Sequence, residues 1–296
     1  MMDRIMRYLP DHVSESLREY NKDSIEEIRL RAGYPPGIVD ECGRSVGVGG
    51  RTVRPAELEQ VLQAASRCSI HAVMGQLCKG FITLEGGHRL GICGTGVEGE
   101  GGIESIREIS SVDLRLAREK KCCASALVKQ LYGQWTQRNV LILSPPGVGK
   151  TTYLRDVIRG LSWGETGRAI RVGLADERGE VGAVWRGEPS MDLGPNTDIM
   201  TGCGKGIAVE YLIRAMNPQI IAVDEITAEE DIEAMERAVG CGIGLLATAH
   251  AGGVDDLKKR PLYRKLLETG CFDTAVILER NGIERRFQIV PLEMNI

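Results

Sequence analysis

The residues of this sequence with the clearest chemical potential lie between Ser144 and Thr152, which read Ser-Pro-Pro-Gly-Val-Gly-Lys-Thr-Thr. They follow the apolar run Asn139–Leu143 and precede a helical pattern, which is the setting that a phosphate-binding loop needs. In such a loop the backbone N–H groups point at phosphate oxygens, the lysine reaches the outer phosphates, and the next hydroxyl ligates Mg²⁺. This pattern predicts that Lys150 and Thr151 bind a nucleoside triphosphate and its metal ion.

The whole loop is predicted to contribute to ATP binding, and a helix that begins near Lys150 would add the positive end of its dipole. The predicted nucleotide-binding residues are Pro146, Gly147, Val148, Gly149, Lys150, Thr151 and Thr152. One position departs from the strict pattern, because Ser144 stands where glycine is usual. A serine fits this turn if its φ stays negative, so the departure concerns turnover rate and leaves the binding prediction unchanged.

Two carboxylates end a later apolar strand, Gln219–Val223, and are the next candidates for chemistry. Mg²⁺ prefers one or two carboxylates together with phosphate oxygens, so we predict that Thr151 and Asp224 are its protein ligands. Glu225 is predicted to orient and polarise the attacking water, since phosphoryl transfer depends on positioning and charge neutralisation. A strand that ends in Asp-Glu is, taken alone, more often followed by a solvated turn. The upstream phosphate loop favours the functional interpretation.

Charged residues also follow two other predicted strands. His250 comes after Gly242–Thr248, and Glu177 and Arg178 come after Ala169–Ala175. Because parallel strands end at one edge of their sheet, these side chains should lie near Glu225. We predict that His250 contacts the γ-phosphate or a catalytic carboxylate, that Glu177 is a second acidic group, and that Arg178 senses the γ-phosphate. The alternatives are a structural histidine and a solvated charged turn.

A further positive charge at the γ-phosphate is often supplied by a neighbouring subunit of such ATPases as an arginine finger. The sequence does not choose among the candidates, which are Arg107, Arg115, Arg118 and Arg178.

The elements that must position these residues alternate between strand and helix from residue 124 onward, which predicts a parallel sheet with crossover helices. Within this part, residues 179–203 are predicted to form a long loop, because they are rich in Gly, Pro and Asp. Thr227 and Glu230 predict a capping box at the start of a helix. Asn281–Gly282 predicts a two-residue hairpin turn near the end of the chain.

The first part of the chain has a different texture, which predicts a smaller α+β domain. Ile25–Arg31 alternates as a half-buried strand does, and Arg54–Ala65 has the pattern of an amphipathic helix. A second helix is predicted over His71–Lys79, and a glycine-rich loop over Gly94–Gly102. With a hinge at Glu119–Lys121, we predict a domain over residues 1–118 and a RecA-like P-loop ATPase domain over residues 119–296.

Composition excludes several classes of protein. A net charge of −4 gives no support to wrapping of nucleic acid, and no apolar stretch approaches the roughly 20 residues of a membrane span. The N-terminus lacks the apolar core of a signal peptide, so we predict a cytoplasmic protein that partners recruit to the inner face of a membrane. The nine cysteines are scattered without a Cys-x-x-Cys pair, which predicts reduced, mostly buried thiols.

The order of these motifs resembles the type II/type IV secretion and pilus-motor ATPase superfamily, in which the acidic and histidine segments are named boxes. Further strings resemble a stage III sporulation family of that superfamily, and the resemblance covers nearly the whole chain. These strings are Glu27–Gly33, Gly91–Thr95, Leu116–Glu119, Pro145–Pro146 and Asp176–Arg178. The resemblance implies a homo-hexameric ATPase with nucleotide at subunit interfaces, acting with membrane-embedded channel proteins between mother cell and forespore.

Three functions follow from these patterns and stay open. The first is a Mg²⁺-dependent ATPase that couples hydrolysis to movement between its two domains. The second is an ATP-binding assembly switch with little hydrolysis, against which Glu225 argues, because a pure binder needs no water-positioning carboxylate. The third is a nucleic-acid-dependent motor, for which local basic clusters leave room, although each is more simply a solvated face. The clusters contain Arg115, Arg118, Lys120, Lys121, Lys258, Lys259 and Arg260.

Overall fold

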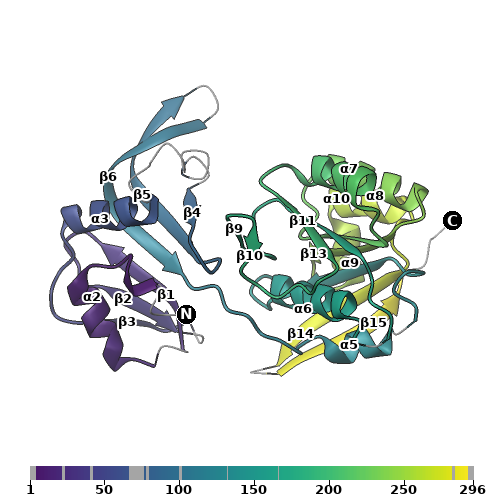
Figure 1. Cartoon of the computed structure of the whole chain (residues 1–296), viewed down its shortest axis with the longest axis horizontal. Coiled ribbons are helices and arrows are strands. Elements are labelled where there is room, and N and C mark those ends of the chain that lie inside the picture. The colour runs from purple at the N-terminus through teal and green to yellow at the C-terminus, as the bar shows by residue number, and fades with distance from the viewer. Residues whose placement is uncertain are drawn as a thin grey trace. The chain divides into compact units, whose positions relative to one another are not determined.

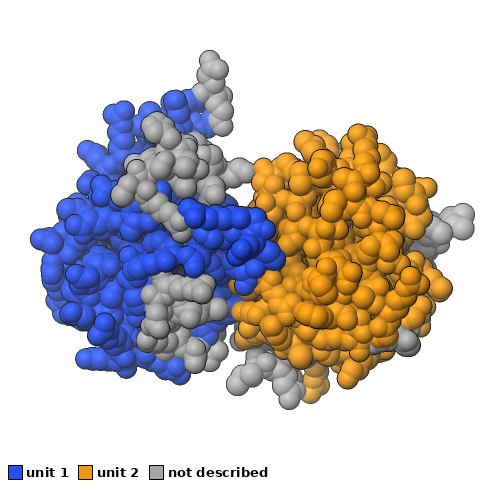
Figure 2. Space-filling view, viewed as in Figure 1, with its two compact units in different colours: residues 1–118, 185–190 blue, residues 119–184, 191–296 orange. Residues whose placement is uncertain are grey.

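The computed structural model describes residues 5–21, 24–40, 43–66, 77, 80–99, 102–131, 133–165, 167–281 and 284–292. The chain forms two compact units (Figure 2). Unit 1 comprises Met1–Arg118 and Trp185–Ser190, and unit 2 comprises Glu119–Val184 and Met191–Ile296.

Unit 1 is built on a six-stranded antiparallel sheet with the order β3-β2-β1-β6-β5-β4. Its strands are β1 Ile25–Arg31, β2 Gly37–Asp40, β3 Ser45–Gly47, β4 Phe81–Thr83, β5 Arg89–Gly99 and β6 Gly102–Arg115. Its helices are α2 Asp11–Ser16, the 3-10 helix η1 Leu17–Glu19, and α3 Pro55–Ser66. The alternation predicted for β1 is confirmed, because Ile25, Ile28 and Leu30 are buried in the core while the intervening side chains are more exposed.

The loop predicted over Gly94–Gly102 is wrong, because β5 and β6 run on through most of it as a long hairpin (Figure 1). The ladder extends from Arg89↔Arg115 to Gly99↔Gly102 with two irregularities of register. A Cβ at Gly94 would lie 2.5 Å from the carbonyl oxygen of Arg107, so this glycine permits a close backbone approach. The helix predicted over His71–Lys79 falls, apart from Leu77, outside the described residues.

Unit 2 contains a seven-stranded sheet with the order β11-β8-β12-β13-β7-β14-β15, in which only the β14–β15 pair is antiparallel. The strands are β7 Val140–Ser144, β8 Val172–Asp176, β11 Thr197–Thr201, β12 Ile220–Val223, β13 Gly244–His250, β14 Thr274–Asn281 and β15 Glu284–Pro291. The helices are α5 Ser125–Gln130, α6 Lys150–Trp163, α7 Lys205–Met216, α8 Glu229–Gly240, α9 Val254–Lys259 and α10 Pro261–Glu268. Across the described ranges, every helix falls short of the length and apolarity that a bilayer crossing requires.

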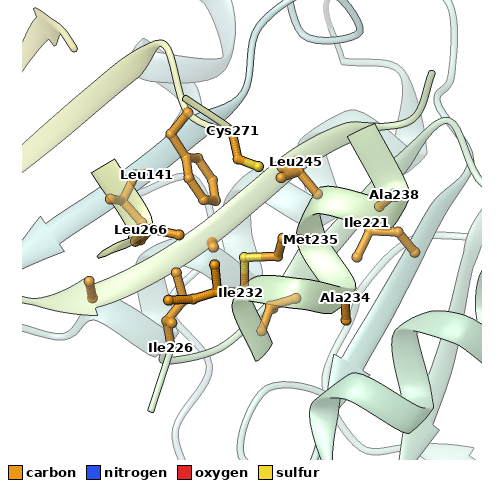
Figure 3. Packing of buried hydrophobic residues seen from close by; sticks show 14 of the residues in the cluster. Leu141, Ile221, Ile226, Ile232, Ala234, Met235, Ala238, Leu245, Leu266 and Cys271 are labelled. Atoms are coloured by element: carbon orange, nitrogen blue, oxygen red, sulfur yellow. The ribbon is translucent and has the colours of Figure 1, made fainter. Parts of the chain in front are cut away.

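The inner strands β7, β8, β12 and β13 are buried and largely apolar because helices cover both faces of the sheet. Successive side chains point to opposite sides, so Leu141 and Leu143 join one hydrophobic cluster while Val140 and Ile142 join another. The first cluster packs against α7, α8 and α10, and Figure 3 shows side chains of α8 and α10 gathered against those of the strands. The second cluster packs against α5 and α6. This sandwich holds the carboxyl ends of the strands in fixed positions.

The long loop predicted over residues 179–203 is wrong in part, because it contains β11 and the short ribbon of β9 Val184–Trp185 and β10 Glu188–Pro189. β11 pairs with β8 along its whole length, from Thr197↔Val172 to Thr201↔Asp176. It is an edge strand whose side chains are only half-buried, so it lacks the apolar run that marks the inner strands. Helices α9 and α10 were also not predicted.

The prediction of mostly buried cysteines is wrong for the cysteines that lie within the described residues. Only Cys271 is buried, whereas Cys93, Cys122 and Cys241 are exposed. Cys123 and Cys203 are half-buried. Cys42, Cys68 and Cys78 lie outside the described residues.

Candidate functional site

The parallel register of unit 2 brings the predicted site residues to one edge of the sheet. His250 at the end of β13 is the register partner of Ser144 at the end of β7. Val223, which precedes Asp224, is paired with Ala247 on one side and with Ala175 on the other. The phosphate loop, the two carboxylates and the acidic turn after β8 therefore begin at the same level of the sheet.

The loop between β7 and α6 has the backbone that its two glycines permit. Gly147 and Gly149 have φ of 80° and 95°, a region that residues with a Cβ rarely adopt. A Cβ at Gly147 would meet nothing within 4 Å, so glycine is needed there for its conformation and not for space. Ser144 is fully buried, its hydroxyl donates to the Pro145 carbonyl at 3.1 Å, and it is not among the described residues with positive φ. Serine is thus compatible with this turn.

Lys150 is buried, and its ammonium group fits a site that binds an anion. It is 6% exposed, and its Nζ has no hydrogen-bond acceptor in the part of the chain that the structure describes. Burial lowers the pKa of Lys150, and the negative charges of Glu225, Asp224 and Glu180 oppose this shift. A buried ammonium without acceptors is costly. The phosphates of a nucleotide would supply the missing acceptors, so this loop fits a triphosphate.

Two oxygen groups beside Lys150 fit a magnesium site. The Thr151 hydroxyl donates to Asp224 Oδ2 at 2.9 Å, which brings together the two residues predicted to bind Mg²⁺. The other carboxylate oxygen, Oδ1, accepts from the Thr248 hydroxyl at 2.8 Å. A hydroxyl and a single carboxylate leave most of the coordination shell to phosphate oxygens and water, as Mg²⁺ prefers.

Glu225 and His250 also lie together, as predicted. His250 Nε2 is 3.4 Å from Glu225 Oε1, and the side chains are 30% and 31% exposed. Glu225 has a φ of 53°, which is uncommon for a residue with a Cβ. Tyr263 supports the pair from α10: its hydroxyl donates to the Ile226 carbonyl and accepts from the His250 N–H, both at 3.3 Å.

The acidic residues of the turn after β8 have different roles, which their sequence pattern does not distinguish. Asp176 is buried and accepts hydrogen bonds from the backbone N–H groups of residues 180–182, and burial raises the pKa of Asp176. Arg155 of α6 donates to the carbonyl oxygens of Glu180 and Val181. These bonds fasten the turn to the helix of the phosphate loop. Glu180, not predicted as a site residue, places its charge near Lys150.

Glu177 contacts a buried lysine, Lys205, which is not among the predicted site residues. Lys205, at the start of α7, is 2.8 Å from Glu177 Oε2 and 3.4 Å from Asp231 Oδ2, and it donates to the Thr227 hydroxyl at 2.9 Å. The capping box predicted for Thr227 and Glu230 is wrong, because the Thr227 hydroxyl is engaged by Lys205 and Ala228 is the N-cap. Asp231 accepts from the N–H groups of Thr227 and Ala228 instead.

The four candidate arginine fingers are distributed over both units. Arg178 is exposed on the turn after β8, and Arg107 is exposed on the β5–β6 hairpin. Arg115 lies 3.3 Å from both Glu27 and Asp113, and Arg118 donates to the Ile25 carbonyl. The choice of finger among them stays a prediction.

Replacing Lys205 with methionine should lower the free energy of unfolding by about 3 kcal/mol, because breaking a buried ion pair costs about 3–5 kcal/mol and Glu177 is partly exposed. Methionine keeps the aliphatic bulk but leaves Asp231 and Glu177 without their cation. The measurement is chemical denaturation of Lys205→Met beside Lys258→Met, a control on the exposed face of α9 that should change stability by less than about 0.5 kcal/mol. Equal stability of the two variants would show that the Lys205 network does not hold these loops together.

Known proteins resemble this chain over nearly its whole length. A family model described as sporulation stage III, protein AA matches residues 2–290. Stage III sporulation protein AA of Bacillus subtilis (strain 168) is 34% identical over 284 residues, which cover 94% of this chain and 91% of that protein.

Solved structures share the fold. The X-ray structure of the ATPase DotB of Legionella pneumophila aligns with 96% of this chain and 80% of its own, with a TM-score of 0.59 at 15% identity. The pilus retraction motor PilT with bound ADP aligns with 96% of this chain and 82% of its own, with a TM-score of 0.59 at 14% identity. The predicted RecA-like α/β fold is thereby confirmed.

Proposed function

Because the chain belongs to the sporulation stage III, protein AA family, we propose that it is a Mg²⁺-dependent ATPase that powers or gates a sporulation channel. One observation carries the proposal: among the described residues, the buried Lys150 finds no acceptor, and its glycine loop lies beside the Thr151–Asp224 pair. A structural lysine would be paired. The PilT structure contains ADP, which supports the same ligand class for this fold.

Binding is assigned to the phosphate loop. The N–H groups of residues 147–152 and the N-terminus of α6 bind the phosphates, and Lys150 neutralises the outer ones. Thr151 and Asp224 hold Mg²⁺, which, when bound, neutralises charge on the phosphate oxygens.

Hydrolysis is assigned to Glu225, with His250 as its neighbour. Glu225 lies one residue beyond Asp224, so a carboxylate that orients water stands beside the metal-binding carboxylate. Its partly exposed side chain can reach a water molecule, and His250 Nε2 at 3.4 Å restricts its orientation. Glu177 and Arg178 are proposed to respond to the γ-phosphate through the acidic turn, which Asp176 and Arg155 fasten to α6.

Within unit 2, contacts support coupling of this site to the segment that enters from residue 118. Asp156 of α6 is buried and accepts hydrogen bonds from the N–H groups of Cys122 and Ala124, at 3.0 and 2.7 Å. Arg159, one turn further along the same helix, donates to Asp156 at 2.8 Å. Because α6 begins at Lys150, a shift of the helix upon phosphate binding would move this entering segment as well. We therefore propose domains over residues 1–118 and 119–296 that move relative to each other.

The assembly is proposed to be a homo-hexamer with nucleotide at subunit interfaces, in which one of the candidate arginines acts on the neighbouring site. Membrane-embedded channel proteins would recruit the otherwise cytoplasmic ring to the inner face of a membrane. The family membership and the fold shared with DotB and PilT support this proposal.

One set of samples tests both the enzyme and the ring. The purified chain should release phosphate from ATP in Mg²⁺ and stop when the metal is chelated, since the charge on the phosphates is then not neutralised. With Mg²⁺ and a non-hydrolysable ATP analogue, light scattering should give the mass of six chains. Nucleotide binding and assembly without phosphate release would favour the assembly switch, and DNA-stimulated, salt-sensitive turnover would favour the nucleic-acid motor.

A further inference from the structure

We propose that Thr248 is a positioning residue that ties the metal-binding carboxylate Asp224 to the backbone of Glu225. The inference rests on the proposed ATPase function, and it adds a residue that neither the phosphate loop nor the acidic segments contain. Thr248 lies on β13, the strand between β12 and β7, so it is placed between the two parts of the site.

The hydroxyl of Thr248 acts as both a hydrogen-bond donor and a hydrogen-bond acceptor. It donates to Asp224 Oδ1 at 2.8 Å and accepts from the Glu225 N–H at 2.9 Å. The residue is fully buried, so these two groups, and not solvent, define its position. A hydroxyl is the smallest side-chain group that can donate to a carboxylate and accept from an amide at once, and Val can do neither.

These bonds fix a backbone conformation that Glu225 would otherwise avoid. Its φ of 53° is costly for a residue with a Cβ, and such a conformation persists only where the surroundings determine it. Thr248 supplies two hydrogen bonds that determine this conformation. Its hydroxyl accepts from the Glu225 N–H, and its carbonyl accepts from the Ile226 N–H at 3.1 Å. The left-handed turn directs the carboxylate to His250, 3.4 Å away.

The same hydroxyl completes a continuous chain of contacts across the site. Asp224 accepts a hydrogen bond from the Thr151 hydroxyl on Oδ2 and one from the Thr248 hydroxyl on Oδ1. Its carboxylate therefore cannot rotate without losing a hydrogen bond. A change at Thr151 or at the metal would reach Glu225 through Asp224 and Thr248. The predicted consequence is that Thr248 affects the rate of hydrolysis more than the binding of nucleotide, because it contacts the groups that orient water and not the loop that binds phosphate.

The test uses Thr248→Val, which keeps the shape and β-branching of threonine, Thr248→Ala as a second variant without the hydroxyl, and Thr248→Ser, which restores it. For both variants without the hydroxyl we expect kcat to fall roughly 10- to 100-fold, since small misplacements of catalytic groups cost up to about 100-fold. KM for ATP should stay within about threefold of wild type, and Thr248→Ser should recover most of kcat. Thr136→Val, an exposed position in the same unit, serves as the matched control.

A second measurement does not depend on hydrolysis. Amide hydrogen exchange at Glu225, followed by NMR in the nucleotide-free protein, should be at least tenfold faster in Thr248→Val than in wild type or Thr248→Ser, because the amide loses its acceptor.

The outcomes separate this inference from the proposed function. Wild-type turnover with an unchanged kcat in Thr248→Val and Thr248→Ala would overturn the role of Thr248 and leave the ATPase intact. A loss in Thr248→Ser as large as in Thr248→Val would also overturn it, since the hydroxyl would then not matter. If wild type itself releases no phosphate, the ATPase proposal fails, and the exchange rate at Glu225 alone decides whether Thr248 holds that residue.

Discussion

Replacing Lys150 with alanine should weaken ATP binding by roughly 100-fold or more. A hydrogen bond to a charged group contributes about 1.5–3 kcal/mol, and the lysine is expected to make more than one to the outer phosphates. Each 1.4 kcal/mol corresponds to about a tenfold change in the dissociation constant. Titration of a fluorescent ATP analogue with Mg²⁺ measures the effect, and an unchanged dissociation constant would refute the assignment of the site.

The same substitution should leave the nucleotide-free protein at least as stable as wild type. Lys150 is buried, its pKa is lowered by that burial, and its ammonium has no hydrogen-bond acceptor among the described residues. Alanine removes this costly charge, so stability and binding should change in opposite directions. Lys129→Ala, an exposed position on α5, is the control and should change neither quantity. A large loss of stability in Lys150→Ala would mean that the lysine supports the fold and not the ligand.

The elements that could be predicted from the sequence are those that their own residues determine, without contacts to distant segments. An unbroken apolar run is required of a strand that is buried on both faces, so β7, β8, β12 and β13 could be recognised without any knowledge of their neighbours. Two glycines before Lys150 indicate a backbone with positive φ, and the structure has it at both. Because parallel strands end at one edge, the meeting of Asp224 with Thr151 and of Glu225 with His250 followed from the order of the motifs.

What could not be predicted depends on contacts between distant segments. Lys205 gives no local indication of its role, because its partners Glu177 and Asp231 lie on other elements. Thr227 has the residue type of a helix cap, but its hydroxyl accepts a hydrogen bond from Lys205. The N-cap of α8 is Ala228, whose N–H donates to the Asp231 carboxylate. β11 has no apolar run because it lies at the sheet edge.

The glycines of β5 and β6 illustrate a different reason for failure. They suggest a loop by composition, but in the structure they permit close approach and register shifts within a hairpin. Glycine content alone does not distinguish these two uses. The partner strand does, and it is known only once the fold is known.

Replacing Glu225 with glutamine should lower kcat for ATP hydrolysis by roughly 100- to 10,000-fold, the range for loss of a positioned general base, while the dissociation constant for ATP stays within about threefold. Glutamine keeps the size of the side chain, and the backbone N–H of residue 225 still finds the Thr248 hydroxyl. The folded state should therefore be retained, because the contact that is lost, with the partly exposed His250, contributes little to stability.

The distinction between a motor and a switch depends on this variant. A switch needs Lys150 and Thr151 to bind nucleotide but makes no use of a water-orienting carboxylate, so Glu225→Gln would leave its small residual turnover unchanged. A motor instead becomes trapped in the ATP-bound state, which single-turnover measurements detect as bound nucleotide that is not cleaved. Glu233→Gln, on the exposed face of α8, is the matched control and should turn over at the wild-type rate. Equal rates for Glu225→Gln and wild type would refute the motor, whatever the affinity for ATP.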